Sequence, residues 1–117
     1  MAALLAPEDS LCGLVSDAVA GLYLEKFGRG PLQTTTFING DVVVTLLSDV
    51  FTPAEKALAD AGKADNVLTM RMLWQQSTDE LFRAKVSDIT GRQVLTAISG
   101  FNLQHDMASE VFVLVPA

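Results

Sequence analysis

Few residues in this sequence have side chains of the kind that catalytic and metal sites use. Cys12 and His105 are the only cysteine and the only histidine among the 117 residues. A thiolate–imidazole pair needs hydrogen-bond contact and a third group that orients the base, and no spacing in the sequence brings these two residues together. His105 and Asp106 offer two metal ligands, whereas a zinc or non-haem iron site needs three or four. We therefore expect no catalytic residue, no metal and no cofactor, and a protein that is not an enzyme.

The stretch KFGRGP (26–31) places two glycines around Arg29, as a phosphate-binding loop can. A phosphate cradle needs glycines that lead into a helix, because the backbone N–H groups and the positive end of the helix dipole converge there. Here the glycines follow a helical pattern, and the lysine and hydroxyl residue of a P-loop are missing. The stretch instead predicts a helix end, with Gly28 in the left-handed position and Pro31 unable to continue the helix.

Four residues remain as candidates for binding a small ligand: Arg29, Arg92, His105 and Glu110. Both arginines follow a glycine at a predicted helix end, and they occupy matching places if the two halves of the chain are related by a pseudo-two-fold. Glu110 interrupts an apolar strand pattern, and a buried carboxylate there would need a partner such as one of these arginines. A solvent-facing or edge position for Glu110, and solvated side chains for the others, are the simpler interpretations.

Composition and charge exclude several classes of function. Fourteen acidic and eight basic residues give a net charge of −6. The basic residues are dispersed, whereas binding to nucleic acid or to an anionic membrane surface needs clustered cations. No apolar run approaches the roughly 20 residues that span a bilayer, and the first ten residues lack the basic region of a signal peptide. A single cysteine allows no disulfide within the chain, so we expect a cytoplasmic protein without membrane insertion.

The first half of the chain reads as a helix followed by a hairpin. Asp9 or Ser10 suits an N-cap, and apolar residues with helical spacing predict a helix from about 10 to 27 after a loose arm at 1–8. A β-hairpin is predicted over 32–48, where Asn39–Gly40 favours a two-residue turn with positive φ at both positions.

This turn fixes which residues of the hairpin share a face of the sheet. It places Phe37 opposite Val42 and Thr35 opposite Val44. One face then carries Phe37, Val42, Val44 and Leu46, and the other carries threonines with Ile38, Val43 and Leu47. We assign the first set to the core and the second to an exposed, partly apolar face.

The second half reads as two helices followed by two strands. TPAEKALADAG (52–62) has a capping box, with Thr52 as N-cap, Pro53 at the first helical position and Glu55 returning a hydrogen bond. Asp65 or Asn66 caps a longer helix that ends at Thr90–Gly91. Two strands follow, over 92–99 and 108–115, joined by the loop GFNLQHD (100–106).

These elements predict one α+β domain over residues 1–117, in the order α-β-β-α-α-β-β. Its two hairpins form a four-stranded antiparallel sheet with the helices packed on one face. The exposed face with Ile38, Val43 and Leu47 favours an interface, because such patches mark interaction sites. We expect a non-enzymatic interaction protein that forms a homo-oligomer, with a dimer favoured. The alternative is a regulatory domain that binds a small ligand between its helices and sheet.

Several segments resemble a family of small bacterial proteins. LYLEKFGRGP (22–31), TPAEKALADAG (52–62), DELFRAKVSDITGR (79–92) and SEVFVLVP (109–116) are similar to the MpsC-like family, named as the C component of a sodium-translocating, membrane-potential-generating system. The resemblance implies a protein of largely unknown function with a possible partner in a membrane complex. A chain without a spanning segment cannot translocate an ion alone, so the implied role is accessory. The loop at 100–106 lacks the acidic, proline-containing sequence of relatives.

Overall fold

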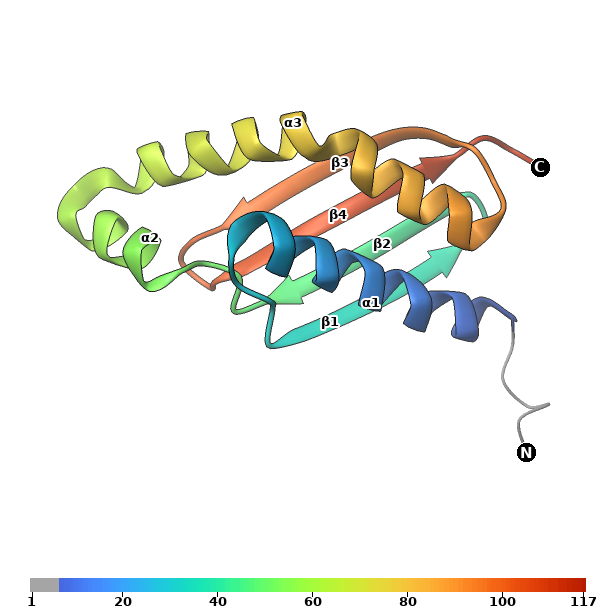
Figure 1. The fold of residues 1–117 in the computed structure, drawn as a ribbon, viewed down its shortest axis with the longest axis horizontal. Coiled ribbons are helices and arrows are strands. Elements are labelled where there is room, and N and C mark those ends of the chain that lie inside the picture. The colour runs from blue at the N-terminus through green and yellow to red at the C-terminus, as the bar shows by residue number, and fades with distance from the viewer. Residues whose placement is uncertain (1–6) are drawn as a thin grey trace.

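The computed structural model of the protein describes residues 7–117 (Figure 1). The elements follow the predicted order, with one short π-helical segment, η2, between the second and third helices. Their bounds are α1 Pro7–Phe27, β1 Gln33–Asn39, β2 Val42–Ser48, α2 Pro53–Leu58, η2 Ala59–Lys63, α3 Ala64–Thr90, β3 Val94–Asn102 and β4 Met107–Leu114.

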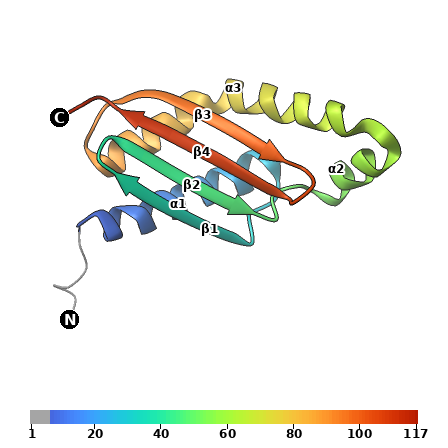
Figure 2. The same ribbon diagram turned by 180° about the vertical axis from the view of Figure 1, so that it is seen from behind.

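The four strands form one antiparallel sheet in the order β1-β2-β4-β3. α1 and α3 lie side by side on one face of this sheet, as Figure 1 shows, and the view from behind in Figure 2 shows the opposite face without a helix. α2 and the first turns of α3 project beyond the end of the sheet. The predicted α+β class, with helices on one face of a four-stranded sheet, is confirmed.

The first helix begins earlier than predicted. α1 starts at Pro7 instead of Ser10, so residues 7 and 8 belong to a helix and not to an arm. The fixed φ of proline suits the first helical position. The rest of the predicted arm, residues 1–6, lies outside the described part of the chain. The helix ends as predicted, with Gly28 at φ 77°.

The predicted hairpin exists, but its turn lies one residue further along the chain. Asn39 pairs with Val42, so the two loop residues are Gly40 and Asp41. Gly40 has φ 60° and Asp41 has no positive φ, a pattern typical of a type II′ turn, which needs glycine only at its first position. Phe37 therefore pairs with Val44 instead of Val42.

The assignment of the sheet faces was wrong. Val43 and Leu47 are fully buried beneath the helices, and Ile38 packs against the same core. Phe37 is 56% exposed, and Leu46 is also exposed on the face that no helix covers. The pattern alone could not decide between the faces, because both carry valine and leucine and the buried one also carries threonine.

The second half of the chain forms largely as predicted. Thr52 accepts a hydrogen bond from the Glu55 N–H, and the Glu55 carboxylate accepts one from the Thr52 N–H, which completes the capping box. Gly62, at φ 83°, marks the turn between the second and third helices, but α3 starts at Ala64, with no side-chain cap. At its other end Gly91 takes the left-handed position at φ 68°.

Candidate functional site

A row of polar side chains crosses the whole sheet beneath the helices. Thr36 pairs with Thr45, Thr45 with Glu110, and Glu110 with Ser99, so each strand gives one residue to the row. The row lies between two mainly apolar rows on the same face, Ile38–Val43–Phe112–Ala97 and Thr34–Leu47–Ala108–Phe101. Ser16 of α1 extends it through a 2.7 Å hydrogen bond to Thr36, whose hydroxyl lies 2.9 Å from that of Thr45.

Glu110 is the only carboxylic acid in this row, and it is 1% exposed. Tyr23 of α1 donates a 2.6 Å hydrogen bond to Oε2, and Ser99 of β3 donates one of 2.5 Å to Oε1. Burial raises the pKa of Glu110 to about 7, the two hydrogen bonds oppose this rise, and the negative charge of Asp79 adds to it. Burial next to this carboxyl also raises the pKa of Tyr23. The carboxyl of Glu110 therefore holds its proton to a higher pH than an exposed glutamate does.

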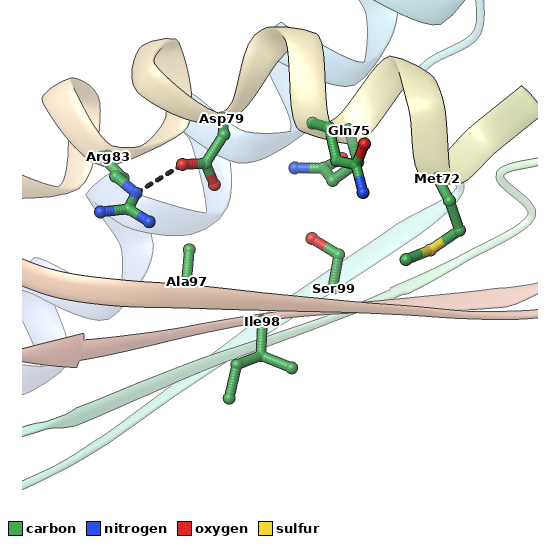
Figure 3. Close-up of a pocket in the computed structure, with 8 residues that line it drawn as sticks. Met72, Gln75, Asp79, Arg83, Ala97, Ile98 and Ser99 are labelled. Atoms are coloured by element: carbon green, nitrogen blue, oxygen red, sulfur yellow. Dashed lines mark ion pairs between the residues drawn. The ribbon is translucent and has the colours of Figure 1, made fainter.

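A cleft of about 410 Å³ lies beside this row, between α3 and β3. Figure 3 shows Gln75, Asp79 and Arg83 extending from α3 toward the strand, and Ala97 and Ser99 extending from the strand toward the helix. Ile98 points to the opposite face of the sheet. Asp79 Oδ2 and Arg83 Nε form an ion pair at 2.5 Å. Ser99 belongs to both the cleft and the polar row, so it connects the cleft to Glu110.

Gln75 is the polar residue of the cleft with the least exposure to solvent, at 5%. Its side-chain oxygen has no hydrogen-bond donor among residues 7–117. A buried acceptor without a donor costs about 1–3 kcal/mol. This oxygen is therefore a position at which a ligand with an N–H or O–H group would gain a contact.

A second buried charge supports the fold at the end of the sheet. Arg71 of α3 is completely buried and donates from Nε and Nη2 to both carboxylate oxygens of Glu55, each at 2.6 Å. Its guanidinium also lies over the rings of Phe27 and Phe51, 4.2 and 4.9 Å from their centroids. Burial alone would raise the pKa of Glu55, but the hydrogen bonds from Arg71 and from the Thr52 N–H lower it. This pair joins α2 to α3, and the contacts assign it a structural role.

Arg29 and Arg92 do occupy matching places in the two halves. Arg29 donates to the carbonyl of Asp49, the residue that follows β2, and Arg92 donates to the carbonyl of Val115, the residue that follows β4. β2 and β4 pair antiparallel, so the two contacts lie at opposite ends of this central strand pair. Each arginine also binds an aspartate, Asp49 and Asp41 respectively, and these lie beyond opposite ends of β2. Neither arginine contacts Glu110, whose partners are the hydroxyls described above.

His105 lies in the exposed loop between β3 and β4. Its backbone N–H donates to the side chain of Asn102, and no described contact involves its ring. The neighbouring Asp106 accepts hydrogen bonds from the N–H groups of Val50 and Phe51, and it pairs with Lys56 at 2.8 Å. Burial alone would raise the pKa of Asp106, but Lys56 and the backbone donors lower it. Arg29, Arg92, His105 and Glu110 are therefore not brought together, and none of them lines the α3–β3 cleft.

The sequence did not indicate the residues that form the cleft. Gln75, Asp79 and Arg83 follow one another at intervals of four on α3, which places them on one face, but polar residues with this spacing usually form a solvated surface. The small size of Ala97 and Ser99 at consecutive inward positions of β3 was the available signal. Within residues 7–117 no three metal-ligating side chains come together, and none of the helices there is long and apolar enough to cross a membrane.

Comparison with known proteins identifies a family. Residues 10–115 match the family described as "Na+-translocating membrane potential-generating system (MpsC)". No curated protein and no solved structure shows significant similarity to the chain. The match covers nearly all of the helices, both hairpins and the cleft between α3 and β3. The chain therefore belongs to the MpsC family.

Proposed function

We propose that this protein is a non-enzymatic, cytoplasmic accessory protein that self-associates through the helix-free face of its sheet. This open sheet face is the single observation that carries the proposal. It consists of Gln33, Thr35, Phe37, Asn39, Val42, Val44, Leu46, Ser48, Thr96, Ile98, Gly100, Asn102, Met107, Ser109, Val111 and Val113. The description of the family, which names a sodium-translocating system, supports the accessory role beside a membrane complex.

The centre of the open sheet face is an apolar row that spans all four strands. Phe37, Val44, Val111 and Ile98 are successive cross-strand partners, and the two outer residues are 56% and 59% exposed. An antiparallel sheet in water usually alternates apolar residues toward the core with polar residues toward solvent. This sheet instead presents large apolar side chains on the side without helices, a feature typical of a covered surface.

A second copy of the chain is the occupant that this face fits. None of its residues is charged, so it offers no ionic contact to a charged partner, and an identical uncharged face is its natural complement in a two-fold dimer. Four strands about 4.8 Å apart and about 24 Å long give a face of roughly 20 by 24 Å. Two such faces packed as a sandwich bury roughly 1,000 Å², about the minimum for a specific interface.

The proposal that the protein is not an enzyme has a separate basis. Cys12 lies in the second turn of α1, whereas the loop that carries His105 contacts Val50 near the opposite end of that helix. The 15 residues from Cys12 to the end of α1 span about 22 Å. At this separation the sole thiol and the sole imidazole do not form a nucleophile–base pair, which supports the proposal.

Sedimentation equilibrium of the wild-type chain and of Phe37→Glu tests the self-association. We expect a wild-type dimer, and a dissociation constant at least about a hundredfold higher for Phe37→Glu, because the dimer would bury an unpaired carboxylate. Leu73→Glu is the matched control, since Leu73 is an equally exposed apolar residue (60%) on α3, away from the sheet. A monomeric wild type, or a dimer that only Leu73→Glu dissociates, would overturn the proposal.

A further inference from the structure

We propose that the cleft between α3 and β3 binds a small zwitterion that carries a primary ammonium and a carboxylate, the chemical class of the free α-amino acids. This site lies on the helix-covered side of the sheet and is independent of the open sheet face. Four polar residues carry the inference: Gln75, Asp79 and Arg83 of α3, and Ser99 of β3.

The cleft exists because the residues that face each other across it do not fill the space. On β3 the inward positions are Ala97 and Ser99, which have small side chains. The α3 residues that line the cleft are Met72 and the polar Gln75, Gln76, Asp79 and Arg83, whereas Phe82 and Val86 of the same helix are buried in the core. Protein interiors are normally close-packed. A volume of about 410 Å³ lined in this way falls in the size range of small-molecule sites.

One wall of the cleft is suited to an ammonium group. The Gln75 side-chain oxygen is buried without a protein donor among residues 7–117, and Asp79 brings a carboxylate to the same face of α3. Glu110 lies behind Ser99, which donates a hydrogen bond to it, and burial together with the repulsion from Asp79 raises the pKa of Glu110. A primary ammonium supplies three donors and a positive charge, so it satisfies the amide oxygen and offsets this repulsion.

The end of the cleft near Arg83 is suited to a carboxylate. The ion pair with Asp79 uses Nε of the guanidinium, and Figure 3 shows its two terminal nitrogens directed toward β3. Two parallel N–H groups match the geometry of a carboxylate. The negative Asp79 and the positive Arg83 are adjacent. They are therefore complementary to the adjacent ammonium and carboxylate of an α-amino acid. Met72 and Ala97 supply apolar surface beside them for a short side chain.

Isothermal titration calorimetry with the full chain tests this inference. The probes are glycine, L-alanine, L-leucine and L-glutamine, and the single-charge comparisons are propylamine and propionate. We expect at least one amino acid to bind, at least about tenfold more tightly than either comparison, because only the zwitterion uses both walls. Absence of heat with all four amino acids at millimolar concentration, or equal binding of propylamine and the best amino acid, would overturn the proposal.

Two variants locate the binding in the cleft. Gln75→Leu removes the unpartnered oxygen, and Ala97→Leu fills the cleft from the strand; each should lower the affinity at least about tenfold. Gln75→Leu should not lower the thermal unfolding temperature by much, because it also removes a buried polar group without a partner. Ala57→Leu makes the same change on an exposed position of α2 and should leave binding unaltered. Amino acid binding that survives both cleft variants would contradict the site. Self-association is measured separately by sedimentation, so the two proposals can fail independently.

Discussion

Replacement of Glu110 by glutamine should remove a large pH-dependent contribution to stability. Burial raises the pKa of this carboxyl from its usual value of 4.5 to about 7, so the folded protein holds the proton more tightly than the unfolded chain does. The free energy of unfolding of the wild type must therefore fall as the pH rises from 4.5 to about 7. Glutamine keeps both contacts, since its oxygen accepts from Tyr23 and its N–H donates to Ser99.

The expected magnitude follows from the size of the shift. A change of about 2.5 pKa units corresponds to about 3 kcal/mol. Between a pH below 4.5 and a pH above about 7, the free energy of unfolding of Glu110→Gln should rise by about 3 kcal/mol relative to that of the wild type. Chemical denaturation of both proteins at each pH measures this difference. Contributions from other titrating groups cancel in this difference. Glu80→Gln, the same change at an exposed position of α3, should show no such gain. A difference between Glu110→Gln and the wild type that stays constant with pH would refute the reasoning.

Three further substitutions test how the fold is held together. Glu55→Gln leaves Arg71 as a buried charge without its carboxylate and should lower the free energy of unfolding by about 3 kcal/mol or more, measured by urea denaturation at neutral pH. Because the pKa of Glu55 is lowered in the folded protein, the wild type should lose this extra stability as the pH falls toward that pKa. Thr52→Ala removes one half of the capping box and should lower the free energy of unfolding by about 1 kcal/mol in the same assay. Gly91→Ala places a Cβ in the left-handed region at φ 68° and should lower stability by about 1 kcal/mol, whereas Gly13→Ala within α1 should raise it.

Local signals in the sequence predicted most of the elements. The capping box at Thr52 and the glycines at 28 and 91 act through contacts within a few residues, and the structure confirms all three. The turn residue was misplaced by one because Asn39–Gly40 and Gly40–Asp41 are both acceptable pairs, and β2 extends its pairing to Val42. The faces of the sheet were exchanged because burial depends on where α1 and α3 pack, which a single hairpin does not encode.

The candidate site was less accessible to prediction because it depends on pairing between distant strands. Glu110 was recognised as unusual within an apolar strand, but its partners proved to be the hydroxyls of Tyr23 and Ser99 instead of an arginine. The first lies on α1 and the second on a strand that pairs only through the final hairpin. A tyrosine within a helix and a serine within a strand have no local pattern that connects them to a carboxylate 87 and 11 residues away.

Cysteine labelling of the open sheet face tests most directly whether that face binds a second copy. With Cys12 replaced by serine, Ile98→Cys introduces a single thiol on the open sheet face, and Leu73→Cys introduces one on α3. We predict that alkylation at position 98 slows as the protein concentration rises through the dimerisation range, while alkylation at position 73 keeps a constant rate. Equal and concentration-independent rates at the two positions, in a protein that sediments as a dimer, would contradict the open sheet face as the interface.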